Sequence, residues 1–420
     1  MRIAVVGGGV AGLYSAWHLA QQHDVVLLER DDRVGGHTDT HEIRLPGRSE
    51  PVAVDTGFIV FNPPNYPLFS AWLTELGVQS RVSDMSFGIS CGATGLEYNA
   101  TDLNGLFCQR RNLFRPEFLG MVRDILRFYR RSESLLAQLD ETTTLGQWLA
   151  GSNFGAAFGR DHLVPMAAAL WSSPGKRILD FPMKYMLEFM QNHSMLQAAR
   201  RPEWRTVKGG SRRYVEAALA RFEGRVSLGS AVRRVVRTAA GVTVETDSER
   251  LDVDQVVLAC HADQALAVLD RPSASESRVL GAITYQDNDM LLHTDASRMP
   301  RNRRAWASWN VRRDPDAPER AGISYWMNRL QGLAETEPLI VSLNQTESVD
   351  PDRVLVRRAY RHPVYTAEAR AAQLELDSIS GSDRIWYCGA CWGWGFHEDA
   401  VRSARQVVDG LQQERLSDAA

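Results

Sequence analysis

The amino-terminal segment constrains the fold of this 420-residue chain more than any other stretch. Residues 2–6 (RIAVV) are apolar and largely β-branched, which predicts a buried strand. This strand runs directly into a G-x-G-x-x-G turn at 7–12, and residues 13–22 have the apolar spacing of a helix. A second apolar run at 25–28 ends at Glu29. The order of strand, glycine turn, helix, strand and acidic residue predicts a dinucleotide-binding unit.

Each part of this unit has a physical role. Gly7 permits the tight turn, Gly9 lets a pyrophosphate approach the backbone, and Gly12 lets the helix pack closely on the strand. The helix N-terminus offers unpaired N–H groups and the positive end of its dipole to phosphates. Glu29 lies near the expected distance of about 20 residues beyond the glycines, where a carboxylate accepts hydrogen bonds from the adenosine ribose.

A second glycine pair follows Glu29 directly, at 33–36 (RVGG). A plain NAD-binding unit has no need of this pair. The segment resembles the R-x-G-G of flavoproteins of the amine oxidase and phytoene desaturase type, in which it lies along the FAD pyrophosphate and ribityl chain. The usual basic residue after the glycines is His37 here, so this chain departs from the pattern at that contact. The resemblance implies FAD as the cofactor.

The carboxyl-terminal stretch has the pattern that completes such a site. Residues 385–390 (IWYCGA) predict a last short strand that ends at Gly389, and residues 393–400 open a helix that runs to Leu411. In the resembled flavoproteins a strand-end glycine contacts the pyrophosphate, and the helix points the positive end of its dipole at the flavin. Residues 55–57 (DTG) resemble a D-x-G beside the flavin ring, although this sequence is also common in plain β-turns.

Chain length and element order predict two domains, because 420 residues are too many for one hydrophobic core. The implied fold class is α/β, with a Rossmann-like FAD-binding domain of the amine oxidase/glutathione reductase type and a second, α+β substrate domain. The FAD-binding domain is expected to be discontinuous, with 1–80, 206–270 and 376–420, and the substrate domain to comprise 81–205 and 271–375. The predicted cofactor contacts are Gly7, Gly9, Val10, Ala11, Gly12, Glu29, Arg30, Gly35, Gly36, His37, Thr38, Asp55, Thr56, Gly57, Val232, Ala259, Gly389, Phe396 and His397.

The remaining pattern predicts the other elements. Residues 52–60 predict a strand, a turn and a strand, 66–76 a helix closed by Gly77, and 81–205 a mostly helical region. After a helix at 212–222, a meander leads to an apolar strand, with segments at 225–228, 231–236, 241–245 and 253–260. A sheet that roofs the flavin is predicted from strands at 283–285, 290–293, 306–309, 323–327 and 339–343.

Composition narrows the functional class. A net charge of −3 argues against a nucleic-acid-binding protein, since no chain-wide basic field is present. Met1 leads straight into the first strand, which leaves no room for a signal peptide, and no apolar run approaches the roughly 18 residues of a membrane span. Five cysteines suit a reducing cytosol, so a cytoplasmic protein is expected. The C-x-x-C at Cys388 and Cys391 lacks the second pair that zinc requires, so it predicts a crowded turn and no metal site.

One helical segment raises a membrane alternative. Residues 117–135 carry apolar side chains at i, i+3, i+4 and i+7. Arginines outnumber acids around this stripe: Arg110, Arg111, Arg115, Arg123, Arg127, Arg130 and Arg131 against Glu117, Asp124 and Glu133. A basic amphipathic helix can lie on an anionic bilayer, which would place the protein peripherally on the inner face of the membrane. A helix packed on its own domain with a solvated basic face explains the same pattern.

The resemblance narrows further when distant segments are taken together. They are 55–66, 83–87 (SDMSF), 204–211 (WRTVKGGS), 325–331 (YWMNRLQ) and 395–399 (GFHED). Together they resemble a bacterial family of FAD-dependent amine-oxidase-type proteins often encoded beside cyclopropane-fatty-acid synthases, and the N-terminal region of the plant synthases. This resemblance spans nearly the whole chain. It implies action on unsaturated or methyl-branched fatty acyl chains of phospholipids, including desaturation of a methylated chain on the way to furan fatty acids.

The chemistry that the residues support is hydride or electron transfer through a flavin. No second G-x-G-x-x-G follows a strand, so the organic substrate is expected to reduce FAD and an external acceptor to reoxidise it. A proton acceptor is needed if a proton leaves with the hydride, and His193, His397 and Glu398 are the candidates. The substrate pocket is expected to be aromatic, with Trp171, Trp309, Tyr325, Trp326, Trp392 and Trp394. Cys391 and His37 are conceivable covalent tethers for FAD, although the complete dinucleotide framework favours a non-covalent cofactor.

Three functional hypotheses follow. The first is an oxidase or desaturase of a fatty acyl chain, which predicts a long apolar tunnel. The second is an amine oxidase, which predicts a short pocket with an aromatic pair. The third is a non-catalytic flavin-binding partner of an acyl-modifying methyltransferase, which predicts bound FAD but no reduction by substrate.

Overall fold

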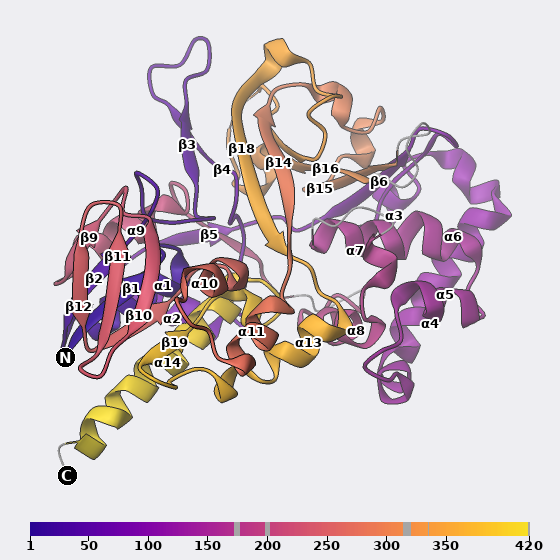
Figure 1. The fold of residues 1–420 in the computed structure, drawn as a ribbon. Coiled ribbons are helices and arrows are strands. Elements are labelled where there is room, and N and C mark those ends of the chain that lie inside the picture. The colour runs from indigo at the N-terminus through magenta and orange to yellow at the C-terminus, as the bar shows by residue number, and fades with distance from the viewer. Residues whose placement is uncertain (172–176, 198–201, 314–320, 335, 419–420) are drawn as a thin grey trace.

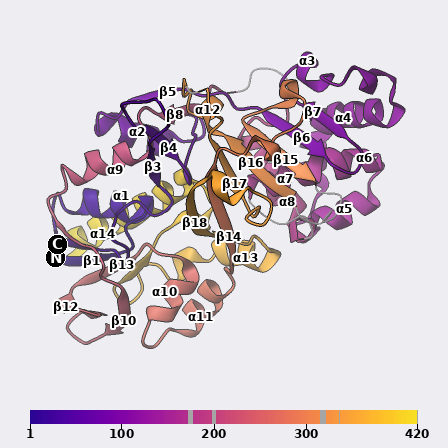
Figure 2. The ribbon, with the colours of Figure 1, turned by 90° about the horizontal axis from the view of Figure 1, so that it is seen from above.

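A parallel sheet forms one end of the molecule. The computed structural model describes residues 1–171, 177–197, 202–313, 321–334 and 336–418. Five parallel strands pair in the order β19-β13-β1-β2-β9. Their bounds are β1 Arg2–Val6, β2 Asp24–Leu28, β9 Arg225–Ser227, β13 Gln255–Leu258 and β19 Ile385–Tyr387. Figures 1 and 2 show this sheet at one end and helices α4, α5 and α6 at the other, with the long strands β14 and β18 between them.

The parallel sheet is covered on both faces, which explains why its strands are continuously apolar. Successive residues of β1 point to opposite sides: Ile3 and Val5 pack with the helices α1, α2, α9 and α14, and Ala4 and Val6 with the opposite layer. The covering helices are α1 Val10–Leu19, α2 Pro67–Glu75, α9 Arg212–Leu219 and α14 His397–Asp418. The opposite layer contains α10 Ala262–Val268, α11 Ala274–Gly281, α13 Ala367–Gln373 and the antiparallel strands β10 Val232–Arg237, β11 Val242–Thr246 and β12 Arg250–Val253.

The amino-terminal unit follows the sequence expectation, and the meander follows it in part. Strand β1, the glycine turn, α1 and β2 occur in the predicted order, and the predicted segments 231–236 and 241–245 form β10 and β11. The third strand of that sheet, β12, was not predicted, and the predicted segment 225–228 forms β9 of the parallel sheet instead. Helix α2 ends before Gly77, which adopts a φ of 71° that glycine tolerates. The second strand expected within 52–60 is wrong: β4 ends at Asp55, and residues 58–60 run as irregular chain.

A seven-stranded sheet forms the central part of the molecule, in the order β18-β14-β17-β16-β15-β6-β7. Its strands are β6 Phe87–Cys91, β7 Leu96–Asn99, β14 Tyr285–His293, β15 Trp309–Arg313, β16 Ala321–Trp326, β17 Ile340–Leu343 and β18 Val354–Pro363. The expected strands at 283–285 and 290–293 are one continuous strand, β14. The expected strand at 306–309 is displaced, because β15 begins only at Trp309.

Several strands of this fold were not expected. Strand β18 pairs with β14 along most of its length, from Tyr285 opposite Pro363 to His293 opposite Val354. Strands β6 and β7 fall inside the region expected to be mostly helical, as does β5 Ser80–Val82, which pairs with β8 Arg205–Val207. Two short strands, β3 Thr40–Ile43 and β4 Val52–Asp55, form a separate hairpin.

The other regular elements described between residues 81 and 205 are helices, as predicted. The α-helices of this region are α3 Leu103–Leu106, α4 Pro116–Gln138, α5 Leu145–Gly151, α6 Ala156–Phe158, α7 Val164–Leu170 and α8 Met183–Asn192. The buried side of α4 packs Phe118, Met121, Ile125 and Phe128 into the largest hydrophobic core. Among the described helices, none is long and apolar enough to cross a membrane. The division into two discontinuous domains stays a prediction.

Candidate active site

The glycine turn has the geometry of a phosphate-binding loop. Gly9 precedes α1, no side chain caps that helix, and its first turn contains no acidic residue. A Cβ atom added to Gly9 would meet nothing within 4 Å, so open space lies in front of this backbone. A Cβ atom on Gly12 would lie 1.9 Å from the carbonyl oxygen of Gly7. Gly12 therefore serves helix–strand packing, and Gly9 leaves room for a phosphate.

The acidic residue after β2 holds the glycine turn. One Glu29 carboxylate oxygen accepts a hydrogen bond from the Gly8 amide at 2.7 Å, and the other accepts from the Asp31 amide at 3.0 Å. Glu29 is buried and lines the main cavity of the protein. A carboxylate oxygen can accept more than one hydrogen bond, so Glu29 remains able to bind a ribose hydroxyl.

The second glycine pair lies directly on the first loop. The Gly35 amide donates to the Gly8 carbonyl at 2.8 Å, and a Cβ atom on Gly36 would lie 3.2 Å from the Gly9 Cα atom. The Arg33 guanidinium donates to the carbonyl oxygens of Gly36 at 2.9 Å and Thr38 at 3.0 Å. The two glycine motifs thus form one compact cradle beside open space, which fits a dinucleotide.

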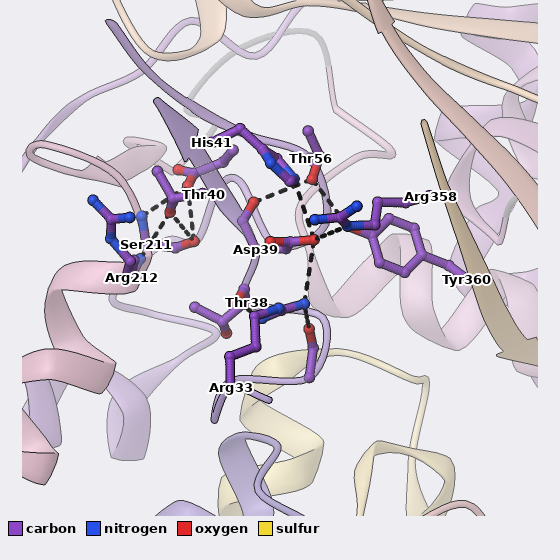
Figure 3. Close-up of polar contacts among 12 residues, drawn as sticks. Arg33, Thr38, Asp39, Thr40, His41, Thr56, Ser211, Arg212, Arg358 and Tyr360 are labelled. Atoms are coloured by element: carbon purple, nitrogen blue, oxygen red, sulfur yellow. Dashed lines mark hydrogen bonds and ion pairs between the residues drawn. The ribbon is translucent and has the colours of Figure 1, made fainter. Parts of the chain in front are cut away.

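A buried carboxylate joins this cradle to the central sheet (Figure 3). Asp39 lies 3.2 Å from both Arg33 and His41, and it accepts hydrogen bonds from Arg358 and Tyr360 on β18, both at 3.1 Å. Burial acts to raise the pKa of Asp39, but the hydrogen bond from His41 and the charge of Arg33 outweigh it and lower the pKa to about 2. The ionised carboxylate therefore fixes the cofactor segment to β18.

The cradle opens into one large cavity of about 1500 Å³. This volume exceeds the roughly 300–1,000 Å³ of an ordinary ligand pocket, so it has room for a cofactor and a second molecule. Of the predicted cofactor contacts, those that line it are Gly7, Gly9, Val10, Ala11, Glu29, Arg30, Gly35, Gly36, His37, Thr56, Gly57, Val232, Ala259, Gly389, Phe396 and His397. Segments far apart in the sequence thus meet around one cavity.

Three predicted cofactor residues do not line the cavity: Gly12, Thr38 and Asp55. Asp55 is fully buried and accepts hydrogen bonds from the Ser211 amide at 2.8 Å and the Gln331 side chain at 3.0 Å. Burial outweighs these bonds and raises the pKa of Asp55 to about 6. Asp55 therefore ties β4 to α9 and to α12 (Met327–Leu330), and its expected place beside the flavin ring stays a prediction.

The remaining cavity lining is strongly aromatic. Four of the six predicted substrate residues line it, namely Trp171, Trp309, Tyr325 and Trp394. Trp171 donates from its indole N–H to the Trp394 carbonyl at 3.2 Å, and the Trp309 and Tyr325 rings meet edge-on with centroids 5.1 Å apart. Phe87, Met166 and Phe189 extend this lining.

The other two predicted substrate residues, Trp326 and Trp392, do not line the cavity. Trp326 packs edge-on against Trp306, with ring centroids 5.1 Å apart, in a small cluster on the outer side of the sheet. Trp392 packs into the core layer beside α10 and α13. Side chains on a strand alternate between faces, so Tyr325 lines the cavity and its neighbour Trp326 cannot.

The three candidate proton acceptors have different surroundings. His193 lines the cavity, and its Nδ1 atom lies 3.0 Å from the Phe189 carbonyl oxygen. A carbonyl only accepts, so Nδ1 carries the proton and Nε2 of the neutral ring remains an acceptor. Burial lowers the pKa of His193 to about 4, which keeps the ring neutral near pH 7. His193 can therefore take a proton from a molecule in the cavity.

His397 also lines the cavity, but its ring is held on several sides. Its Nε2 atom lies 3.2 Å from the Thr38 hydroxyl and 3.1 Å from the Tyr214 hydroxyl, and its ring stacks on Phe58 at 3.6 Å. Burial lowers the pKa of His397 to about 3. These contacts fix the N-terminus of α14 beside the cradle, so we assign His397 to positioning.

Glu398 does not line the cavity, and its role as a proton acceptor stays a prediction. Its two carboxylate oxygens accept hydrogen bonds from the amides of Leu68 and Phe69, both at 3.0 Å. The carboxylate thus satisfies the first turn of α2, a helix distant in the sequence. Asp399 caps its own helix by accepting from the Phe396 amide at 3.0 Å.

Sequence reasoning missed a group of cavity residues next to His37. The His37 ring lies 5.3 Å from His362 and 6.2 Å from His261, and the His261 ring stacks on Tyr285 at 4.3 Å. Burial lowers the pKa of His261 and His362 to about 3. His261 directly follows the predicted strand 253–260, where ligand-binding residues of parallel sheets gather, so this signal was available. His362 belongs to β18, which the sequence did not predict.

The cysteines are free, and the C-x-x-C forms no disulfide. Cys391 lines the cavity, but burial raises the pKa of its thiol to about 11, which leaves it protonated. A protonated thiol is a poor nucleophile. A tether at Cys391 is therefore disfavoured, and non-covalent attachment of FAD stays a prediction.

The fold and the cradle define a flavoprotein of the dinucleotide-binding α/β class. Residues 10–294 match the family model for flavin containing amine oxidoreductases, so the chain belongs to that family. This membership confirms the expected fold class, the expected flavin-containing oxidoreductase and the expected cofactor, FAD.

The chain is also similar to several individually named proteins. AofH of Mycobacterium tuberculosis, named as a flavin-containing monoamine oxidase, is 28% identical over 287 residues, which is 66% of this chain and 61% of that protein. The match therefore spans less than two thirds of that relative. Cyclohexylamine oxidase from Brevibacterium oxydans superposes with a TM-score of 0.70 at 15% identity, covering 98% and 99% of the two chains. A fatty acid isomerase from P. acnes that produces CLA gives a TM-score of 0.64 at 15% identity, covering 97% and 98%.

Proposed function

We propose that this protein is an FAD-dependent oxidoreductase that oxidises an apolar substrate, namely an unsaturated or methyl-branched fatty acyl chain of a phospholipid. The observation that carries this proposal is the lining of the cavity beyond the cradle. It is built from aromatic and aliphatic side chains, including Trp171, Phe189, Trp309 and Met166. Such a surface binds an acyl chain by removing apolar area from water.

The carboxylates in this lining argue against a dedicated ammonium site. Asp84 pairs with Arg329 at 2.8 Å, and Glu203 pairs with Arg205. These two carboxylates are thus already neutralised, and the faces of the aromatic rings beside them remain to attract a cation. A neutral, elongated substrate fits this lining better than a small amine.

The chain's own residues supply positioning, dryness and proton transfer. Trp171 and Trp394 are fixed to each other by a hydrogen bond, so the wall of the cavity is rigid where a substrate would lie. The apolar lining excludes water from the reacting carbon. His193 presents an unprotonated Nε2 atom that can accept the proton lost when a C–H bond is oxidised. FAD, when bound by the cradle, supplies the acceptor for the hydride.

Anaerobic titration of the holoenzyme tests the proposal. We expect the visible flavin band to bleach on addition of phospholipid with unsaturated or methyl-branched chains, but not on addition of amines such as putrescine or cyclohexylamine. Bleaching by amines alone would overturn the acyl assignment. Bleaching by none of these molecules would favour a flavin-binding partner of an acyl-modifying methyltransferase.

A steric variant sharpens the test. Ala100 is half-buried and lines the cavity, so Ala100→Trp should block an acyl chain and slow bleaching on the order of tenfold or more. Ala53 is a half-buried alanine outside the cavity, and Ala53→Trp is the matched control. Equal rates in the two variants would contradict the proposed path of the substrate.

The second candidate function is amine oxidation. The family membership and the likeness to AofH favour it. The same titration decides between the two functions, because each predicts bleaching by a different substrate.

A further inference from the structure

One surface of the helical region combines exposed apolar side chains with arginines. It comprises α3, the 3-10 turn Arg110–Phe114 and the outer face of α4, and we call it the α3–α4 surface. Figures 1 and 2 show α4 at the end of the molecule opposite the parallel sheet. Its exposed apolar side chains are Leu103, Leu113, Phe114, Leu119 and Leu126. Phe114 is 86% exposed and Leu103 is 75% exposed, so neither contributes to the core.

Leucines and arginines alternate along the outer face of α4. Leu119, Arg123, Leu126 and Arg130 follow one another at spacings of four, three and four residues, which places them on one stripe of the helix. All four are exposed. The opposite stripe, with Phe118, Met121, Ile125 and Phe128, is buried in the core. Packing of the helix on its own domain therefore explains the buried stripe and leaves the outer leucines without a partner in the described part of the chain.

The charged side chains of this surface are mostly positive. Residues 103–131 contain seven arginines and two acids, and both acids are engaged: Glu117 pairs with Arg160 at 2.8 Å, and Asp124 is buried and pairs with Arg127 at 3.3 Å. Among the described residues, only Arg123 and Arg127 of these arginines pair with a carboxylate, and five have none within ion-pair distance: Arg110, Arg111, Arg115, Arg130 and Arg131. The rest of the chain must be acidic overall, because the whole carries a net charge of −3. This segment is thus locally basic within a chain that is acidic overall.

We propose that the α3–α4 surface docks on an anionic phospholipid bilayer. Interfacial helices bury leucine and aromatic side chains among the acyl chains while arginines contact the headgroups, and the exposed stripe of α4 presents both kinds of side chain. The exposed Phe114 and Leu113 at the start of α4 add an apolar tip. An acidic protein surface would pair with the arginines but leave the leucines exposed to water. A second copy of this chain would cover the leucines but leave the arginines without opposite charges.

The docking surface adjoins the cavity of the proposed active site. Thr101 is exposed and lines the cavity, and it lies two residues before Leu103. Tyr129 lines the cavity from α4, between the outward-facing Leu126 and Arg130 in the sequence. A bilayer on the α3–α4 surface would therefore lie close to one rim of the cavity. Docking itself needs no turnover, so it stands or fails independently of the proposed substrate.

Sedimentation with vesicles tests the proposal on the full-length holoprotein. We expect binding to vesicles of phosphatidylcholine with phosphatidylglycerol, and little binding to pure phosphatidylcholine. Each arginine near an anionic bilayer raises the binding affinity roughly fivefold. R123E/R130E should therefore weaken vesicle binding by at least about tenfold. Raising the salt to 1 M should weaken binding too, since the Debye length then falls to about 3 Å.

Matched controls keep charge and apolar effects apart. R250E/R271E makes the same change of charge at two exposed arginines, one on β12 and one between α10 and α11, and should bind like the wild type. Phe114→Ser should weaken binding without lowering the thermal midpoint, and Leu374→Ser, at a residue 72% exposed elsewhere, should do neither.

Three results would overturn the proposal: no binding to anionic vesicles at low salt, equal losses in the control variants, or a dimer in light scattering that Phe114→Ser converts to a monomer. The last result would identify the surface as a contact between copies of this chain. Vesicle binding without flavin bleaching would leave docking supported and would count against the acyl substrate alone.

Discussion

Two alanine substitutions in the glycine turn should have opposite consequences. Gly9 has a φ of −68° and a ψ of −179°, which alanine adopts without strain, and its Cβ would meet nothing within 4 Å. Alanine restricts the unfolded chain more than glycine does, which stabilises the folded state by roughly 0.4–1 kcal/mol. Alanine is also a poorer N-cap than glycine, which costs a similar amount of stability. The two effects nearly cancel, so we expect Gly9→Ala to leave the thermal midpoint of the apoprotein within about 2 °C.

The same variant should lose the cofactor. The open space in front of Gly9 is where a pyrophosphate would meet the backbone, and a methyl group there pushes the phosphate away. A hydrogen bond to a charged group contributes about 1.5–3 kcal/mol. Losing one such bond should therefore weaken FAD binding by about ten- to a hundredfold. Titration of the apoprotein with FAD, followed by quenching of flavin fluorescence, measures this loss.

Gly12→Ala should instead damage the fold itself. Its Cβ would lie 1.9 Å from the Gly7 carbonyl oxygen and 3.1 Å from the Ala259 Cβ, so α1 and β1 must separate. Overpacking costs about 1–3 kcal/mol even where side chains can yield, and here backbone atoms collide. We expect a clear fall in the thermal midpoint of the apoprotein. Wild-type affinity for FAD in Gly9→Ala, or equal destabilisation by both variants, would refute the reasoning.

Three further predictions concern buried polar groups. Glu398→Ala removes the acceptor for two α2 amides and should lower stability by about 0.5–2 kcal/mol while leaving kcat unchanged; a loss of turnover at unchanged stability would contradict its structural role. His193→Phe should lower kcat by about a hundredfold or more without weakening FAD binding, and unchanged kcat would exclude it as the base. Asp55, with its pKa raised to about 6 against about 3.9 when unfolded, holds more protons in the native state between those values, so its contribution to stability falls as the pH rises from about 4 to about 6. The thermal midpoint of the wild type should therefore fall relative to that of Asp55→Asn across this interval, and parallel curves would contradict the raised pKa.

The sequence by itself determined the local units whose geometry depends on near neighbours. The glycines at 7, 9 and 12, the β-branched run of β1 and Glu29 fix a strand–turn–helix unit through steric and hydrogen-bonding rules that act over a few residues. For α4 this holds only in part, because the predicted apolar stripe contains the buried Phe118 and Ile125 but also Leu119 and Leu126, which are exposed. The family resemblance then supplied the cofactor, since R-x-G-G is a local pattern as well.

The tertiary structure decided every feature that depends on which strand or helix lies opposite. Strand β18 has three arginines in ten residues and no clean apolar alternation, so only its pairing with β14 reveals it and brings Tyr360 and His362 to the cavity. The sequence offered Glu398 as a candidate catalytic carboxylate, whereas in the structure its carboxylate accepts hydrogen bonds from two amides of α2. Contacts between distant segments set these roles, because burial and hydrogen-bond partners are properties of the assembled core.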